Sequence, residues 1–253
     1  MTMIDPMSLS VFTLLLLCIL VVAILYSSVG HGGASGYIAA LALFSVTPVA
    51  FKPTALVLNI LVSTVAILSF ARAGHFSWRL FWPFATASIP CSFIGGYLSL
   101  PLHLYQPLVG VILLFSACRL FYHTEHIDTE IRQPSVPVAL CCGALLGLLS
   151  GLTGVGGGIF LSPLLLLLKW GRAREVSAVA ALFILVNSIA GLLGHLSSLQ
   201  VIPSFAPLLA VAALTGGSIG AFFGSRRLPT ATVIKSLAVV LVIAGFKLLF
   251  ILK

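Results

Sequence analysis

Long apolar runs, separated by short polar, charged or proline- and glycine-rich stretches, fill almost the whole chain. Runs of about 18 or more apolar residues are typical of helices that cross a lipid bilayer. The runs predict helical segments at about 9–27, 35–46, 52–71, 79–99, 106–122, 136–150, 159–168, 176–195, 204–224 and 230–251. The pattern therefore predicts an all-α polytopic membrane protein.

The predicted segments form two sets of five, and the second set repeats the first. A shift of 124 positions superposes three glycines of each half, Gly30, Gly32 and Gly33 on Gly154, Gly156 and Gly157. A markedly polar stretch, residues 123–133, falls between the two sets. An internal duplication follows, with a first transmembrane repeat at 1–122, a polar linker at 123–135 and a second transmembrane repeat at 136–253.

Each glycine cluster lies inside an apolar run, where every glycine costs a helix about 1 kcal/mol. A cluster therefore predicts a break in the helix, and a break at membrane depth must line a cavity or be buried in protein. The helix that restarts after the glycines points its first N–H groups and the positive end of its dipole at the break, which attracts anions. Because the next segment has only about ten residues, we expect each break to form a hairpin that enters the membrane and returns.

The basic residues indicate which face of the membrane is cytoplasmic. With returning hairpins, ten of the thirteen Lys and Arg lie on one face: Arg72, Arg79, Arg119, Arg132, Lys169, Arg172, Arg174, Arg226, Arg227 and Lys235. Positive loops favour the cytoplasm, so we assign that face to it. The two halves are then inverted repeats, each with a glycine-broken helical hairpin plus about three spanning helices. Eight continuous spans remain an alternative.

Inverted repeats would bring the two glycine breaks together near the membrane midplane, where a transported substrate binds. The candidate substrate-binding residues are the glycines of both breaks and the polar side chains near them: Gly30, His31, Gly32, Gly33, Ser28, Asn59, Ser63, Thr153, Gly154, Gly156, Gly157 and Asn187. The alternative is that these glycines only allow close helix packing. Packing glycines are expected at Gly143, Gly147 and Gly151, which repeat every four residues along one helix face.

The polar candidates have simpler interpretations as well. A serine hydroxyl can bond to its own helix backbone, and Asn59 or Asn187 can either donate to an oxyanion or bond a neighbouring helix. His31 can contact substrate or a proton, or remain a neutral, hydrogen-bonded histidine. Lys52 is expected to snorkel to the membrane interface, with attraction of anions as the alternative.

Composition narrows the function classes. The chain is 60% hydrophobic and 7% charged, which is typical of membrane proteins, and its net charge of +8 is too scattered for a nucleic-acid surface. The acids lie in the tail and the loops, which disfavours a cation pump. The five cysteines show no metal-binding spacing, and the linker histidines and acids are better interpreted as solvated. We expect neither metal nor cofactor, and the oligomeric state is left open.

Two stretches resemble a known family. The stretch Ser28-Val29-Gly30-His31-Gly32-Gly33 and its partner, residues 151–158, resemble the broken-helix signature of the sulfite exporter TauE/SafE family of membrane permeases. The resemblance extends over essentially the whole chain. It implies transport of small sulfur-containing anions such as sulfite, sulfoacetate or other organosulfonates, usually outward across a bacterial inner membrane. The family motif falls on the same glycines of both breaks.

The expected function is therefore transport of a small sulfur oxyanion by alternating access, without catalysis. An anion channel is the alternative within transport. A membrane assembly protein without cargo is a further alternative, although it does not explain paired breaks. An intramembrane hydrolase would use Ser35 with His31 or His195, but their spacing fits no established nucleophile motif.

Overall fold

A computed structural model describes residues 9–28, 30–121, 131, 134–197, 202–224, 242, 246 and 249. Apart from turns and short connections, this part of the chain is helical, without strands. The helices are α1 (Leu9–Ser28), α2 (Ala34–Leu43), the short 3-10 helix η1 (Pro48–Ala50), α3 (Phe51–Arg72), α4 (Trp78–Tyr97), α5 (Leu102–Phe121), α6 (Val136–Thr153), α7 (Gly158–Leu167), α8 (Ala173–Ser197) and α9 (Ala206–Gly224). The first nine predicted segments are confirmed, and the tenth lies almost entirely outside the described residues.

Five of the described helices are long and apolar enough to cross a membrane: α1, α3, α6, α8 and α9. Their outward faces carry large apolar side chains such as Leu14, Leu145 and Val211, which are more than half exposed. A surface of this kind is stable against lipid and not against water. The prediction of an all-α membrane protein is confirmed.

Both short helices fold back against the helix that precedes them. A Cβ built on Gly36 of α2 would lie 2.5 Å from Cγ1 of Val22 in α1, and the hydroxyls of Tyr26 and Ser35 are 2.7 Å apart. A continuous helix would separate Val22 from Gly36 by about 20 Å. In the second half, a Cβ on Gly157 would lie 3.4 Å from the carbonyl oxygen of Leu146 in α6. The chain therefore reverses at each break, as the predicted hairpins require.

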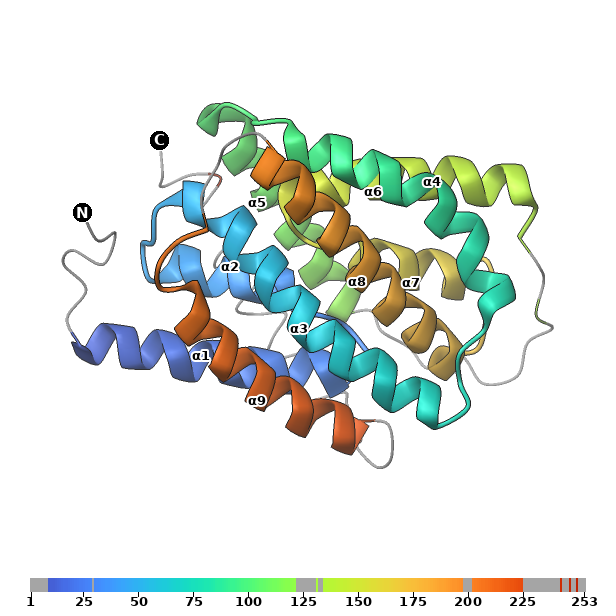
Figure 1. Cartoon of the computed structure of the whole chain (residues 1–253), viewed down its shortest axis with the longest axis horizontal. Coiled ribbons are helices and arrows are strands. Elements are labelled where there is room, and N and C mark those ends of the chain that lie inside the picture. Colours follow the sequence, from blue (N-terminus) through green and yellow to red (C-terminus); the bar gives the residue numbers. More distant parts are fainter. Residues whose placement is uncertain are drawn as a thin grey trace.

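The two longest helices, α3 and α8, lie side by side in the middle of the molecule (Figure 1). A Cβ on Gly191 of α8 would lie 3.5 Å from Cδ2 of Leu56, while Asn59, one turn further along α3, bonds Ser188, one turn earlier on α8. The numbers rise on one helix as they fall on the other. The two helices are therefore antiparallel.

Two outer pairs flank this centre, α1 with α9 on one side and α4 with α6 on the other (Figure 1). Their contact surfaces are built on glycine. A Cβ on Gly147 of α6 would lie 2.2 Å from the carbonyl oxygen of Ser88 in α4, and one on Gly216 of α9 would lie 2.3 Å from that of Leu20 in α1. Glycine is the residue that lets two backbones approach this closely. The predicted packing role of Gly143, Gly147 and Gly151 is confirmed.

The elements of the two halves correspond. The shift of 124 positions carries α2 onto α7 residue for residue and α3 onto α8 to within two residues at each end. The contacts correspond as well, because the first helix of each half packs on the fourth helix of the other half. The two halves thus exchange their outer helices around the α3 and α8 pair.

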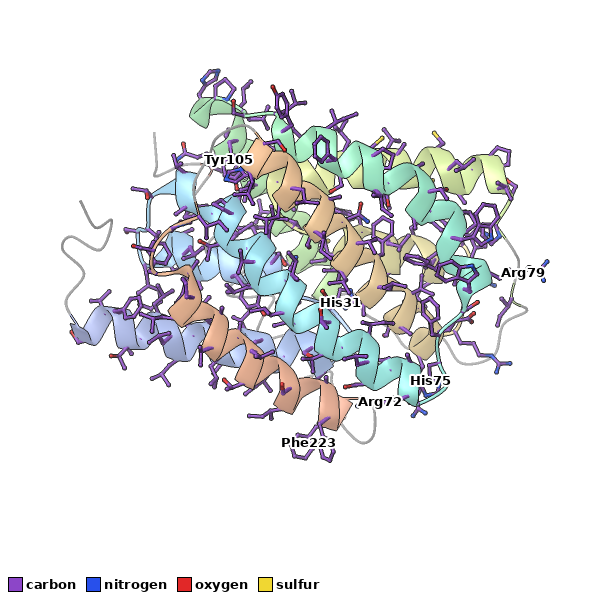
Figure 2. The ribbon with its side chains drawn as sticks, viewed as in Figure 1. His31, Arg72, His75, Arg79, Tyr105 and Phe223 are labelled. Atoms are coloured by element: carbon purple, nitrogen blue, oxygen red, sulfur yellow. The ribbon has the colours of Figure 1, made fainter. Side chains whose placement is uncertain are left out.

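Several basic residues lie at one end of this bundle. Arg72 ends α3, and Arg79 lies in the first turn of α4. Figure 2 labels both arginines and His75, which lies in the connection between the two helices. A Cβ on Gly171, in the loop between α7 and α8, would lie 3.0 Å from Cδ2 of Leu80. That loop, with Lys169, Arg172 and the nearby Arg174, therefore shares the end of the molecule with Arg72 and Arg79. This grouping agrees with the predicted positive face; Arg132, Arg226, Arg227 and Lys235 lie outside the described residues.

Candidate anion site at the two glycine breaks

Both breaks use backbone conformations that favour glycine. In the first, φ is +76° at Gly30 and +99° at Gly33. In the second, φ is +78° at Gly154, +80° at Gly156 and +75° at Gly157. A side chain at any of these positions would strain the left-handed backbone. The sequence thus stops each helix within a few residues and restarts it in the opposite direction.

The two breaks meet against the central helices. A Cβ on Gly32 would lie 2.9 Å from Cγ2 of Ile184 in α8, and a Cβ on Gly156 would lie 3.0 Å from the same atom. The two breaks therefore approach each other to within about 6 Å. Gly32 and Gly156 are equivalent under the 124-residue shift, so the predicted convergence is present in the structure.

Asn59 of α3 lies between the breaks and touches both. Its Oδ1 would be 2.5 Å from a Cβ on Gly32, and its Nδ2 would be 2.5 Å from a Cβ on Gly156. The same Nδ2 donates to the carbonyl oxygen of Val155, in the second break, at 3.3 Å and to Oγ of Ser188 at 3.4 Å. Asn59 is fully buried. Among the predicted site residues, it is the polar side chain that the fold brings to the meeting point.

Each break also rests on the beginning of the long helix of the other half. A Cβ on Gly30 would lie 2.8 Å from Cβ of Ser177 in α8, and a Cβ on Gly154 would lie 2.9 Å from Cα of Lys52 in α3. The shift of 124 positions places Lys52 next to Ser177 in the repeat. The breaks are therefore held by equivalent contacts, one in each half.

The short helices begin without side-chain caps. The N-cap residues of α2 and α7 are Gly33 and Gly157, and neither supplies a capping side chain. The first N–H groups of a helix have no partner within that helix, and they carry the positive end of its dipole. Two such ends, brought together in the protein interior, form an environment that favours an anion.

The predicted hydroxyls are buried, but their protons are used locally. Ser28 donates to the carbonyl oxygen of Leu25 at 2.7 Å, Ser63 to that of Asn59, and Thr153 to that of Leu149 at 2.7 Å. Each bond lies within the hydroxyl's own helix, which was the simpler of the two interpretations. Thr153 also accepts a bond from the backbone N–H of Val155 at 3.4 Å, so it steadies the start of the second break.

Asn187 lies in the contact between α4 and α8. Its Nδ2 donates to Oγ of Ser88 at 3.0 Å and to the carbonyl oxygen of Phe183 at 2.8 Å. The hydroxyl of Ser92 donates to the backbone carbonyl of Asn187 at 2.7 Å. The structure therefore gives Asn187 the interhelical hydrogen bond, and it does not place its amide against a glycine break.

The two basic candidates differ in their positions. His31 is half-buried, and its backbone N–H donates to the carbonyl oxygen of Tyr26 at 2.9 Å, which closes the turn of the first break (Figure 2). The expectation that Lys52 snorkels to the interface is wrong. Lys52 is buried, and its ammonium donates to the carbonyl oxygens of Gly95, Gly96 and Leu98 at 2.8 to 3.1 Å. Those carbonyls end α4 and attract a cation.

Sequence reasoning missed three residues of this centre: Ile184, Ser188 and Ser177. They are apolar or small and carry no signal by themselves. The 124-residue shift could have found two of them, because it superposes Ile60 on Ile184 and Thr64 on Ser188, both next to candidate positions. Among the described residues, no group of three or more His, Cys, Asp and Glu side chains could hold a metal ion. The linker histidines lie outside the described residues.

One known protein family matches nearly the whole chain. The model of the family described as "Sulfite exporter TauE/SafE" matches residues 15–248. The chain belongs to the sulfite exporter TauE/SafE family. It is therefore a member of a family of membrane transporters, and the resemblance noted from the two glycine stretches is confirmed.

Relatives in three organisms extend this assignment. "Probable membrane transporter protein y4hK" of Sinorhizobium fredii is 42% identical over 91% of this chain and 95% of its own length. "Probable membrane transporter protein YunE" of Bacillus subtilis is 24% identical over 94% of this chain and 97% of its own. "Probable membrane transporter protein MJ0441" of Methanocaldococcus jannaschii is 28% identical over 57% of this chain and 55% of its own. No solved structure matches the chain.

Proposed function

We propose that this chain transports small sulfur-containing anions, such as sulfite, sulfoacetate or other organosulfonates, and binds them where the two glycine breaks meet. The observation that carries the proposal is the approach of Gly32 and Gly156 to within about 6 Å of each other, on the same Ile184 methyl group. Each break opens a short helix whose N-cap glycine brings no capping side chain. Amides from both halves would replace part of the anion's hydration shell.

The charges around the site favour an anion over a cation. Within the described residues, Glu175 is the one acidic side chain, and it is half-buried in the first turn of α8. Its Oε2 lies 3.5 Å from a Cβ built on Gly171, so the carboxylate faces the loop between α7 and α8 and not the breaks, where it could bind a cation or relay a proton. His31, inside the first break, adds a group that is able to carry positive charge when an anion arrives.

The proposed mechanism is alternating access by two inverted repeats, 1–122 and 136–253, joined by the linker 123–135. Its support is the antiparallel pairing of α3 and α8, which are equivalent helices of the two halves. Equivalent helices that run in opposite directions across one bilayer belong to repeats of opposite orientation. The halves would rock about the meeting point and expose the anion first to one face and then to the other.

The family's description is the support for the proposed cargo class and for the proposed direction. Its description names sulfite export, so we assign outward movement across a bacterial inner membrane, with the basic end of the bundle in the cytoplasm. An anion channel would place a continuous pore between the breaks instead. A membrane assembly protein would neither bind nor move an anion.

The test is efflux from proteoliposomes loaded with sulfite, with sulfate- and chloride-loaded vesicles as comparisons. We expect saturable sulfite efflux, at rates of about 1 to 1,000 per second, the range of ordinary turnover. Anion efflux at rates far above that range would indicate a channel. Folded, correctly inserted protein that releases none of these anions would contradict the proposed transport and favour the assembly role.

A further inference from the structure

The orientation of the Asn59 amide is fixed by its neighbours. The side chain has one donating end, Nδ2, and one accepting end, Oδ1. Nδ2 lies 3.3 Å from the carbonyl oxygen of Val155, which is an acceptor and cannot donate. Turning the amide over would place two oxygens against each other. The donating end therefore belongs to the second break, and the accepting end faces the first.

The accepting end has no partner within the described structure. Oδ1 of Asn59 is buried and accepts no hydrogen bond, although it points at Gly32, where a Cβ would be only 2.5 Å away. Asn59 itself is 0% exposed. A buried acceptor without a donor is costly, so it calls for an explanation such as a bound ligand, a water or a role in the mechanism. This one lies between the two breaks of the proposed anion site.

We propose that the cargo carries a hydrogen-bond donor next to its anionic oxygens, and that Oδ1 of Asn59 accepts from that donor. The class includes hydrogensulfite and sulfonates with an amino or hydroxyl group. Sulfate, simple alkylsulfonates and ionised sulfoacetate, whose polar atoms are all acceptors, fall outside it. The inference rests on the proposed function and refines it, because the same site would bind only part of the sulfur anions.

The site then distinguishes the two kinds of group on one small molecule. Its anionic oxygens face the uncapped N-termini of α2 and α7, which supply N–H donors. The hydrogen-bond donor of the cargo faces Oδ1 of Asn59. An anion that has only oxygens would set one of them against Oδ1 and leave that acceptor unpaired, which is a stronger penalty than a lost contact at the surface. Because Asn59 and Ile184 lie against both Gly32 and Gly156 in this conformation, the cargo would have to part the breaks to enter.

Two pairs of probes test the inference on the purified, full-length protein. Sulfamate and methanesulfonate have nearly the same shape and differ in an amino group in place of a methyl group. The second pair is 2-hydroxyethanesulfonate and ethanesulfonate, which differ by one hydroxyl. Dissociation constants come from ligand-dependent thermal stabilisation. We expect the donor-bearing member to bind about tenfold tighter or more in at least one pair; a smaller ratio in both pairs overturns the inference.

Variants on α3 locate the effect. Asn59→Leu removes Oδ1, so the ratio within the selective pair should fall to about one. Thr64→Ala is the matched control, because that hydroxyl donates to the carbonyl oxygen of Ile60 in its own helix, and it should keep the ratio. A ratio that survives in folded Asn59→Leu means that another residue accepts from the cargo's donor, and it overturns the inference.

If Asn59→Leu does not fold, Ser188→Ala replaces it. Ser188→Ala removes one acceptor of Nδ2 and leaves Oδ1 in place, so the preference for the donor-bearing probe should remain. Loss of that preference would contradict the assignment to Oδ1. Failure of all four probes, and of sulfite, to stabilise folded protein would overturn the proposed function itself. Binding of both members of each pair with equal affinity would overturn only the donor inference.

Discussion

Asn59 in the first half donates a hydrogen bond to the carbonyl oxygen of Val155 in the second half, 96 positions further along the chain. The bond joins a long central helix to the glycine break of the other half. Together with the contact of Gly32 on the same side chain, it makes Asn59 the side chain on which the two glycine breaks meet. A movement of one half against the other must change these contacts, and we therefore place cargo binding here.

Gly156→Leu should abolish transport. The residue has φ +80°, and its Cβ would lie 2.5 Å from Nδ2 of Asn59, so the substitution both strains the backbone and fills the meeting point. Membrane insertion should remain, because the apolar spans are unchanged. Sulfite efflux from proteoliposomes, normalised to inserted protein, measures the effect.

Gly74→Ala is the matched control for this prediction. Gly74 has φ +76°, and a Cβ there would meet nothing within 4 Å, so the variant carries the backbone strain without the steric conflict. It should retain transport. If Gly156→Leu transports as well as the wild type, the breaks do not form the site.

Lys52→Met should lower stability. The substitution removes three hydrogen bonds and leaves the carbonyl oxygens of Gly95, Gly96 and Leu98 without their donor. Hydrogen bonds to charged groups contribute about 1.5 to 3 kcal/mol, so we expect a net loss of about 3 kcal/mol after the methionine side chain repacks. Thermal unfolding in detergent measures the loss. Lys169→Met, at an exposed lysine, is the control. Equal thermal unfolding midpoints for the two variants would contradict a stabilising role of the three Lys52 hydrogen bonds.

Gly147→Leu should prevent α4 and α6 from packing. Its Cβ would lie 2.2 Å from the carbonyl oxygen of Ser88, and backbone cannot yield as a flexible side chain does. We expect little monodisperse protein after extraction, as judged by size-exclusion chromatography. Leu145→Ala changes a 60% exposed, lipid-facing side chain on the same helix and should behave as the wild type. A well-behaved Gly147→Leu would refute the glycine contact.

Arg79→Cys and Arg172→Cys should be labelled from the same side of the membrane. The first turn of α4 and the loop between α7 and α8 lie at one end of the bundle, where Leu80 packs on Gly171. In a background without the five native cysteines, a membrane-impermeant maleimide should react with both only after the cytoplasmic face is opened. Reaction of the two from opposite sides would favour eight continuous spans over returning hairpins.

Much of the fold could be predicted from the sequence, because hydrophobic runs are ended by charges, Pro or Gly. The ten-residue length of α2 and α7 and their place after each break were visible in this way. The 124-residue shift also exposed the equivalence of Gly32 and Gly156. These features are local, or are repeated in the chain, so they need no knowledge of packing.

The partners of the site residues could not be predicted, because they depend on how helices pack. Lys52 precedes Pro53 at the start of an apolar run, so it had the appearance of an interface lysine. Only the arrival of the end of α4 beside it explains its burial. Asn59 and Asn187 had equal standing as donors in the sequence, and the fold separated them, one between the breaks and the other between α4 and α8.

The most direct test of the account is binding of sulfite, with sulfoacetate, sulfate and chloride alongside, to purified wild-type, Gly156→Leu and Gly74→Ala protein. A ligand at 100 times its dissociation constant stabilises a protein by about 2.7 kcal/mol, which thermal unfolding resolves easily. We predict that sulfite or sulfoacetate stabilises the wild type and Gly74→Ala and has no effect on Gly156→Leu. Folded wild-type protein that none of these anions stabilises, or equal stabilisation of Gly156→Leu, would contradict an anion site at the two glycine breaks.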